Sequence, residues 1–500
     1  MLANKFTSHA QKGFKANTPG CLEHSFAMFE ALLDAKHEQR QIVVTWLDLC
    51  NAYGSVKHNL IQFALHWYHV PESLCHLLLN YYDNLHASIH TKQWTSASFP
   101  FHIGLFQGCV LSCILFSCVF QLVLDLLHPF AEKHGYYFKD SDLVLHDQAF
   151  ADDLSITSSS PETNQATLDV VVRFLLWAYF KAKPAKCICM GMKRFDPHST
   201  SNHYIRHGDS VYAPFDPELN IAGEKIRFIV NAAADSNSLQ YDHFKELGRL
   251  ISVDLREDKI RNEIQRRLLS DVEKVENSGV NGLCKLFLYE HFIVSRLSWF
   301  FLVHDLSLTF ARELDDKVIP RLKKWAGLYR SADLGALFRN RDHLGLQLTS
   351  ISYHYKHMQV VRSCLLSTSK DPLIQQIFHR KTERVSAFTR RWSGPKMLTV
   401  LAPIVNHSIR FAGQTDRAGL GARNLRYLSQ PKPSEIRLKT GEILDQLEEE
   451  NYLQHASCLA RQGIWTQFED VRPFDLSWKN LIYGPGPKVI AFVLNAKSTL

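Results

Sequence analysis

The chain has 500 residues, of which 46% are apolar, so its length allows about three domains and its composition supports sizeable cores. Its net charge of +7 is unevenly divided: lysine plus arginine number 20 against 24 acids in residues 1–250, and 37 against 26 in residues 251–500, giving −4 and +11. No apolar segment follows the first positive charges, which argues against a secretory signal, and the eleven cysteines include no Cys-x-x-Cys pair, which argues against a zinc finger.

The first predicted elements are a helix near Ser25–Lys36 and a buried strand over Gln41–Asp48 that ends in an acid. A turn follows this strand and carries Tyr53, five residues after Asp48. The next predicted helix, His58–Tyr68, has its apolar side chains on one stripe. We expect that stripe to pack on the sheet to which the strand belongs.

The segment Val110–Leu127 is apolar over a length that resembles a membrane span. Polar side chains interrupt it at Ser112, Ser117, Gln121 and Asp125. We therefore predict a buried helix, in a protein that has no association with a membrane.

The tetrapeptide Phe150-Ala151-Asp152-Asp153 lies between two apolar segments and predicts a hairpin whose turn carries adjacent carboxylates. Together with Asp48 at the end of a strand, this hairpin would bring three acids to one place. Cations relieve such repulsion, and two divalent ions about 3.5–4 Å apart clamp the attacking and leaving oxygens in phosphoryl transfer. Taken singly, each aspartate could equally be a turn former or a helix cap.

Beyond the hairpin the pattern becomes largely helical. A helix is predicted over Thr163–Lys181, with Leu168, Val171, Val172, Leu175 and Leu176 facing inward. The polar stretch Asp196–Asp216 predicts a connecting loop or a loose hairpin. Three further helices are predicted over Asp258–Asn277, Gly282–Val303 and Leu308–Arg330, and the acidic run Glu448–Glu450 predicts a helix end.

The basic half of the chain mixes cations with aromatic side chains in two clusters, Arg321–Trp325 and Arg380–Trp392. Such clusters suit a phosphate backbone, although basic helix faces are also common in proteins that bind no nucleic acid.

The order of four segments resembles the successive palm motifs of reverse transcriptases. More narrowly, it is similar to the polymerases of non-LTR retrotransposons whose fuller members carry a restriction-like endonuclease. The segments are Gln11–Phe14 with Gly20–His24, Asp48–Val56, Gly104–Phe116 and Phe150–Asp153. The resemblance covers residues 8–350 and is weaker from there to residue 500.

This resemblance implies an α+β fold with a right-hand polymerase palm, in which an antiparallel sheet packs on helices, with Val110–Leu127 as the buried helix behind the active site. The implied domains are partial fingers at 1–40, the palm or reverse transcriptase domain at 41–254, a helical thumb and basic duplex-binding region at 255–400, and a C-terminal extension of unknown role at 401–500.

Carried over by motif, the resemblance implies that Asp48 and Asp152 bind the metal ions and that Asp153 supports the same metal site. Because neighbouring side chains of a strand face opposite ways, only one acid of the pair would point fully at the metals. Tyr53 matches the aromatic residue that lies under the sugar of an incoming nucleotide and excludes a 2′-hydroxyl.

Further positions follow from the same resemblance. Gln107 and Gly108 match the pair that contacts the incoming nucleotide and the template base, where glycine allows a close backbone approach. Lys186, with Lys183 as its rival, matches the lysine that helps to protonate the pyrophosphate leaving group. Phe244–Gly248 resembles the hairpin that grips the primer end, although it could equally be an ordinary strand and turn.

These residues predict an RNA-directed DNA polymerase that extends a primer 3′-hydroxyl with deoxynucleoside triphosphates (dNTPs), using two Mg²⁺ ions for which Mn²⁺ could substitute. The expected partners are an RNA template, a DNA primer and dNTPs. The family resemblance implies a nuclear location, with the cytoplasm as the alternative.

The fuller relatives have upstream fingers segments and a downstream zinc knuckle and endonuclease, which we expect this chain to lack. A second hypothesis is therefore a catalytically inactive, nucleic-acid-binding remnant of a retrotransposon polyprotein. A third, a metal-dependent nuclease, is weaker because a hydrolase has no evident use for Tyr53 or for Gln107 and Gly108.

Overall fold

The computed structural model describes residues 7–195, 205–207, 210–229, 240–241, 243–340, 345–392 and 433–457. The chain divides into two compact units: the first comprises Met1–Leu255 with Ser369–Lys381, and the second Arg256–Thr368 with Thr382–Leu500. Most of the extension predicted at 401–500 lies outside the described residues.

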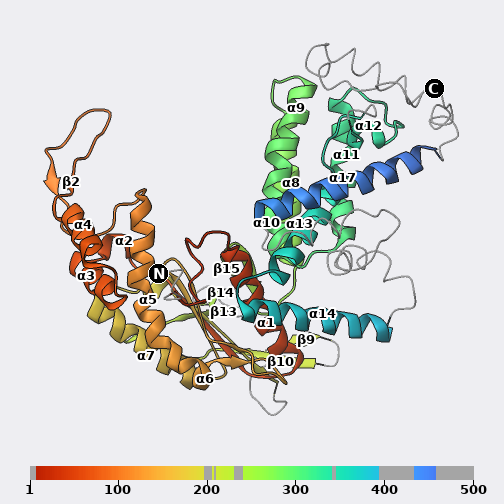
Figure 1. Cartoon of the computed structure of the whole chain (residues 1–500). Coiled ribbons are helices and arrows are strands. Elements are labelled where there is room, and N and C mark those ends of the chain that lie inside the picture. Colours follow the sequence, from red (N-terminus) through yellow and green to blue (C-terminus); the bar gives the residue numbers. More distant parts are fainter. Residues whose placement is uncertain are drawn as a thin grey trace. The chain divides into compact units, whose positions relative to one another are not determined.

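An eight-stranded, mainly antiparallel sheet organises the first unit (Figure 1). Its main path runs β14–β13–β8–β1–β7–β6, and β10 pairs with both β8 and β9. The strands are β1 (Ile42–Leu47), β6 (Asp147–Phe150), β7 (Asp153–Ser158), β8 (Ile188–Arg194), β9 (Ile205–His207), β10 (Ser210–Phe215), β13 (Arg227–Ile229) and β14 (Gln240–Tyr241). All six residues of β1 are buried, as expected for a strand that is covered on both faces.

Short two-stranded ribbons and helices complete the first unit. The ribbons pair β2 (His86–Ala87) with β3 (Phe99–Pro100), β4 (Tyr136–Tyr137) with β5 (Val144–Leu145), β11 (Asn220–Ile221) with β12 (Glu224–Lys225), and β15 (His243–Glu246) with β16 (Arg249–Ser252). The helices are α1 (Gly20–His37), α2 (Ala52–Ser55), α3 (His58–Trp67), α4 (Glu72–Asp83), α5 (Val110–Leu127), α6 (Ala131–His134) and α7 (Pro161–Ala178), with 3₁₀ turns at His128–Phe130 and Pro184–Lys186.

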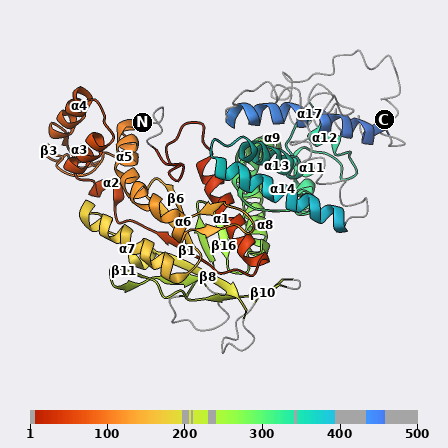
Figure 2. The ribbon, with the colours of Figure 1, turned by 60° about the horizontal axis from the view of Figure 1, so that its bottom comes forward.

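Helices cover both faces of the sheet (Figure 2). Thr45 Oγ1 in β1 donates to Asn164 Oδ1 in α7 at 2.7 Å. The neighbouring Val44 pairs with Thr157, whose hydroxyl lies 3.6 Å from Met28 Sδ in α1. Because successive side chains of a strand point to opposite faces, α7 and α1 cover opposite faces of the sheet.

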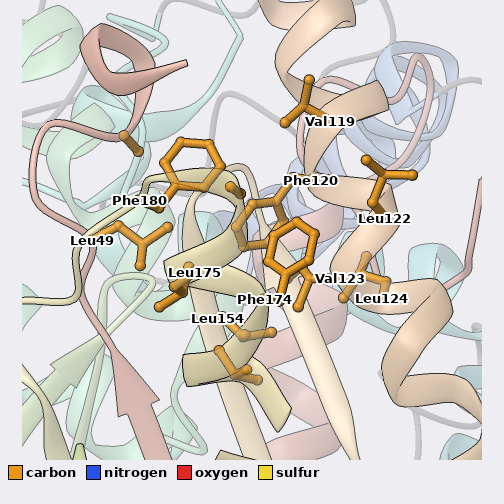
Figure 3. Close-up of a cluster of buried hydrophobic side chains, with 14 of the residues drawn as sticks. Leu49, Val119, Phe120, Leu122, Val123, Leu124, Leu154, Phe174, Leu175 and Phe180 are labelled. Atoms are coloured by element: carbon orange, nitrogen blue, oxygen red, sulfur yellow. The ribbon is translucent and has the colours of Figure 1, made fainter. Parts of the chain in front are cut away.

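The main apolar core lies on the face that α7 covers. Side chains of α5 and α7 meet those of the strands there, and Figure 3 shows Phe120, Val123, Phe174, Leu175 and Leu154 among them. Two buried residues of the same cluster, Leu49 and Phe180, follow β1 and α7 directly. The core therefore extends to the end of the sheet where β1 stops.

Helix α7 begins at Pro161, two residues before its predicted start at Thr163, and it differs from its prediction in two further respects. It ends at Ala178 instead of Lys181, because Tyr179 adopts a left-handed conformation with φ of 60°. Leu176, expected to face inward, is 68% exposed, while Leu168, Val171 and Leu175 are buried. The predicted apolar stripe of α7 wrongly included Leu176, because at 3.6 residues per turn this side chain lies outside the buried face of the helix.

Two helical stretches, Val110–His134 and Gly282–Val303, are long and apolar enough to cross a membrane by length and composition alone. Helices of a protein core pass the same test, and 61% of the apolar window in the first stretch is buried inside the protein. The absence of a membrane association stays a prediction.

The described part of the second unit is helical. Its elements are α8 (Asp258–Glu276), α9 (Gly282–Leu288), a π-helical segment (Tyr289–Val294), α10 (Ser295–Val303), α11 (Leu308–Trp325), α12 (Gly335–Phe338), α13 (Ile351–Ser367) and α17 (Pro433–Ser457), while α14 (Pro372–Trp392) is divided between the units. The three helices predicted after residue 255 are present. The second runs through the π-helical segment, and the third ends at Trp325 instead of Arg330.

We predicted that the acidic run Glu448–Glu450 ends a helix. This prediction is wrong, because the run lies inside α17. Glu449 Oε1 accepts a hydrogen bond from Arg339 Nε at 2.9 Å, and Glu448 pairs with Lys356 of α13. These acids therefore help to attach α17 to the other helices of its unit. The α+β class and the antiparallel sheet packed on helices are confirmed, whereas the assignment of fingers, palm and thumb to these units stays a prediction.

Candidate active site

Three aspartates meet at one end of the sheet, where β1 stops and β6 turns into β7. Because β1 pairs with β7 in the register Leu47↔Leu154, the next residues, Asp48 and Asp153, lie across from one another. Phe150 pairs with Asp153 across β6 and β7, which leaves Ala151 and Asp152 as a two-residue turn. The structure thus brings together the three acids that the sequence singled out.

The three carboxylates disfavour one another's negative charge. Desolvation raises the pKa of Asp152, and the charge of Asp48 adds to this effect. Desolvation, followed by the charges of Asp152 and Asp48, raises the pKa of Asp153 to about 6, although this side chain keeps an exposed edge. The site therefore holds more negative charge than its own cations neutralise.

Lys186 supplies a positive charge beside these acids. Its Nζ lies 3.3 Å from Asp48 Oδ2, with the two side chains 60% and 33% exposed. The 3₁₀ turn Pro184–Lys186 brings it there, and the backbone N–H of Lys183 donates to the carbonyl of Asp48 at 2.9 Å. The sequence left two candidates for the lysine of the site. Lys186 places its ammonium group beside Asp48, whereas Lys183 interacts with Asp48 only through its backbone N–H among the contacts described.

The acids fit a divalent cation. Asp48 Oδ2 is a buried acceptor without a hydrogen-bond donor, since its contact with Lys186 does not have hydrogen-bond geometry. Divalent cations such as Mg²⁺ and Mn²⁺ prefer carboxylate oxygens as ligands, and they relieve repulsion between neighbouring carboxylates. A buried oxygen without a hydrogen-bond donor, beside two acids with raised pKa values, is an environment in which such an ion is stabilised.

A cavity of about 430 Å³ opens beside the acids and contains two charged residues for which the sequence gave no site role. Its wall includes Asp48, Asp153 and Lys186, together with Arg227 and Glu246. Burial, followed by the charge of Asp153, raises the pKa of Glu246 to about 8. The only sequence signal for Glu246 was its position in the hairpin Phe244–Gly248, because its approach to Asp153 depends on tertiary packing.

That hairpin is formed by β15 and β16, which pair in the register Glu246↔Arg249. Its two turn residues, Leu247 and Gly248, have φ values of 44° and 87°, as a type I′ turn requires. The Phe244 ring lies 5.1 Å from the ring of Trp46, between centroids, so the hairpin packs beside the end of β1. A role in holding a primer stays a prediction.

Tyr53 lies on α2, beyond the end of β1. Its ring stacks on that of Phe116 in α5, with centroids 4.4 Å apart and an interplanar angle of 9°. The rings of Phe14 and Tyr53 are nearly perpendicular, with centroids 6.5 Å apart. Burial raises the pKa of the phenol, and the charge of Asp152 contributes to this shift. Tyr53 is therefore a neutral, half-buried aromatic residue near the acids, on a support provided by α5.

Gln107 and Gly108 lie on an exposed turn that precedes α5. Gly108 has a φ of 97°, a conformation that favours glycine, while a Cβ added there would meet no atom within 4 Å. The glycine is thus explained by its backbone conformation, and the contact of Gln107 and Gly108 with a nucleotide stays a prediction. The backbone N–H of Leu105 donates to the carbonyl of Tyr53 at 2.8 Å, which connects this turn to α2.

The predicted basic clusters are partly neutralised within the protein. Lys323 Nζ donates to the carbonyls of Arg330 and Ala332, and Lys324 pairs with Glu276. In the other cluster, Arg380 and Lys381 pair with acids of α1 at 3.3 and 2.6 Å. The side chains of its remaining basic residues, Arg384, Arg390 and Arg391, lie outside the described residues.

Comparison with known families agrees with the motif order. Residues 1–206 match the model of the family described as reverse transcriptase (RNA-dependent DNA polymerase). The retrovirus-related Pol polyprotein from the type-2 retrotransposable element R2DM of Drosophila melanogaster is 29% identical over 184 residues, which are 37% of this chain and 17% of the relative. The retrovirus-related Pol polyprotein from the type-1 retrotransposable element R2 of Nasonia vitripennis is 24% identical over 301 residues, covering 52% of this chain and 28% of the relative. The chain thus spans 17% and 28% of the lengths of these two proteins.

Among solved structures, apo telomerase from Candida tropicalis matches with 8% identity and a TM-score of 0.36, over 81% of this chain and 57% of that one. Telomerase from Candida albicans, in complex with a TWJ fragment of telomeric RNA, matches with 8% identity and a TM-score of 0.28, over 75% and 55%. TM-scores at this level do not establish a common fold.

Proposed function

We propose that residues 1–206, which match the reverse transcriptase family, form a reverse transcriptase domain of the non-LTR retrotransposon kind, and that the chain is an RNA-directed DNA polymerase. It extends the 3′-hydroxyl of a DNA primer with dNTPs on an RNA template. The observation that carries this proposal is the meeting of Asp48, Asp152 and Asp153 at the end of the sheet, where a buried Asp48 oxygen accepts no hydrogen bond.

The family implies the use of divalent metal ions. We propose two Mg²⁺ ions, replaceable by Mn²⁺, held by Asp48 and Asp152 with Asp153 in support. When bound, such ions lower the pKa of the attacking hydroxyl and neutralise charge on the triphosphate. The carboxylates contribute by being fixed on rigid strands, so that reacting groups bind in one orientation.

Other residues of the site have proposed roles in binding and proton transfer. Lys186 Nζ, protonated and partly exposed, is suited to donate a proton or positive charge to the pyrophosphate leaving group. Tyr53, supported by Phe116, would exclude a 2′-hydroxyl from the incoming sugar. Gln107 and Gly108 would contact the nucleotide and the template base. A Tyr53→Val variant tests the proposed exclusion of the 2′-hydroxyl. Loss of the ring should increase the rate at which ribonucleotides are incorporated.

The two units receive their roles by the same proposal: partial fingers at 1–40, palm at 41–254, and thumb with duplex-binding region at 255–400. Within the proposed thumb, Lys323 donates to two backbone carbonyls and Lys324 pairs with Glu276, so other cations would contact the duplex. Nuclear residence is proposed from the family relationship, and microscopy of the tagged chain would test it.

Primer extension tests the proposed activity. Asp152→Asn should abolish extension with little loss of thermal stability, because the residue is required for its charge. Asp169→Asn is a matched control, since Asp169 is an exposed acid of α7 that accepts a hydrogen bond from Gln165. Undiminished extension by Asp152→Asn would remove the mechanism. The alternative of an inactive nucleic-acid-binding remnant is not favoured, because the acids of the site are present and lie together.

A further inference from the structure

The turn that carries Asp152 is held in an unfavourable conformation. Ala151, the first of its two central residues, has a φ of 58°, whereas Asp152 lies outside the positive-φ region. This pattern is that of a type II′ turn, whose first central position is normally glycine. A residue with a Cβ is strained there, so the conformation persists only if its surroundings impose it.

Gln11 makes the contacts that impose it. Its Nε2 donates to the carbonyl of Ala151 at 3.1 Å, and its Oε1 accepts from the N–H of Ala151 at 3.0 Å. Oε1 also accepts from the N–H of Gly13 at 2.8 Å. The side chain is 1% exposed, so these hydrogen bonds form without competition from water. One carboxamide thus binds both peptide groups of the strained residue.

The segment around Gln11 is fixed to the same edge of the sheet. Ala149 in β6 donates its N–H to the carbonyl of Ala10 at 2.8 Å and accepts from the N–H of Lys12 at 2.9 Å. A Cβ added to Gly13 would lie 2.4 Å from the nitrogen of Ala151, so only glycine permits this approach. Residues 10–13 therefore follow β6 and the turn at backbone contact distance.

A buried ion-pair network anchors the segment from behind. Lys12 Nζ lies 2.7 Å from both Glu23 Oε2 and Asp371 Oδ2, with side-chain exposures of 4%, 2% and 10%. Ser369 Oγ donates to the second oxygen of Glu23 at 2.6 Å. Removing one partner of such a network leaves a buried charge uncompensated, which resists any displacement of Lys12.

We propose that Gln11 is a positioning residue for the acids of the site: its carboxamide holds the Ala151–Asp152 turn in the strained conformation that presents Asp152 beside Asp48. The expected effect of Gln11 on the rate of primer extension rests on the proposed polymerase function. Its expected effect on the conformation of the turn does not. The motif Gln11–Phe14, which the sequence marked only as a family resemblance, thereby receives a physical role.

A double-mutant cycle tests the coupling. Gln11→Met keeps the length and approximate volume of the side chain and removes every hydrogen bond, so kcat for primer extension should fall on the order of 10–100-fold, with a smaller change in KM for dNTPs. In an Ala151→Gly background the same change should cost less, because glycine adopts a positive φ without strain. Equal losses in the two backgrounds, or no loss in either, would overturn the proposal.

Asn164 provides the matched control. It is a fully buried amide of α7 that donates to backbone carbonyls of the sheet away from the turn. The effects of Asn164→Leu should be the same in both backgrounds, since distant sites act independently. If Gln11→Met does not fold, Gln11→Glu takes its place in the cycle, because the ionised carboxylate keeps the accepting oxygen and replaces the donation to Ala151 O by repulsion between two oxygens.

A readout independent of activity separates this proposal from the proposed function. Hydrogen–deuterium exchange of a peptide covering residues 147–156 should be faster in Gln11→Met than in the unmodified chain, while peptides of α7 exchange at the same rate. Unchanged exchange at the turn would overturn the role of Gln11 whether or not the chain polymerises. Faster exchange in a chain without polymerase activity would keep the role of Gln11 and refute the proposed function.

Discussion

Two polar clusters on the same pair of strands differ in how completely they are satisfied. Asn164 is fully buried, accepts a hydrogen bond from Thr45, and donates to the carbonyls of Val43 and Ile156 and to Ser158 Oγ at 3.3–3.4 Å. At the end of the same strands, Asp48 has a buried oxygen that lies 3.3 Å from Lys186 Nζ but accepts no hydrogen bond, and it faces two acids with raised pKa values. The first cluster has its hydrogen-bond partners within the protein, whereas we propose that a bound cation completes the second.

This difference separates polar residues that stabilise a fold from those that serve a site. A buried polar group with all its partners contributes to stability and specificity. Buried groups that repel one another reduce stability, and they are retained where they bind something. The two clusters therefore predict opposite effects of substitution on stability and on activity.

The largest expected effect is at the acid cluster. Asp48→Asn should reduce primer extension by about 10³-fold or more, because a ligand to the catalytic ions is lost. The thermal midpoint of the metal-free chain should stay the same or rise, since a repelling charge has been removed. Melting curves and extension rates of one preparation would check both statements. A large fall in stability would show that Asp48 belongs with the structural cluster instead.

A smaller loss is expected at Lys186. Lys186→Ala should lower the rate of extension by about 10²-fold, the usual contribution of a positioned general acid. Lys183→Ala is its natural control, because Lys183 interacts with Asp48 through its backbone and should retain far more activity. Equal losses in the two variants would contradict the assignment of the leaving-group role to Lys186.

The complete cluster predicts the reverse pattern. Asn164→Ala leaves several buried groups without partners, so the free energy of unfolding should fall by about 1–3 kcal/mol. Chemical denaturation would measure this change. Metal binding by the folded variant should be unaffected. A change in metal affinity would show that the two clusters are coupled through the strands.

The smallest expected effect is a pH dependence of stability. The folded chain binds protons more tightly than the unfolded chain, because the pKa of Asp153 is raised from 3.8 to about 6 and that of Glu246 from 4.5 to about 8. The free energy of unfolding of the metal-free chain should therefore fall as pH rises from about 4 to about 8.

Added Mg²⁺ should reverse this loss increasingly over the same range, because metal ligands must be deprotonated. Thermal melting at several pH values, with and without Mg²⁺, checks the direction. In Glu246→Gln the decline should end about one pH unit above the Asp153 pKa of about 6, once that carboxyl has titrated. A metal-free chain that becomes more stable across this range would contradict the assigned pKa shifts.

The elements of the site were predictable where local pattern decides them. A buried run ending in Asp48 gives β1, and the tetrapeptide Phe150–Asp153 between apolar segments gives the β6–β7 hairpin. The sequence could not supply Glu246 or Arg227, because they reach the cavity only through the packing of β13 and β15. Nor could it reveal that Gln11 holds Ala151, since 140 residues separate them and no local periodicity records the contact.

Other wrong predictions concern positions where a single residue determines the end of a helix or the contacts of a charged run. Tyr179 ends α7 by adopting a positive φ, which no stop signal in the sequence announces. The acids of α17 were interpreted as a helix end because charge runs are usually solvated, but two of them have partners on distant segments of the second unit.

Metal binding by the acid cluster is the most direct test of the account. Titration of Mn²⁺ into the full chain, followed by electron paramagnetic resonance, should show ions bound to the unmodified protein and to Asp169→Asn. Binding should be lost when Asp48 and Asp152 are both replaced by asparagine. Retention of the same bound Mn²⁺ by that double variant would contradict the claim that these carboxylates form the metal site.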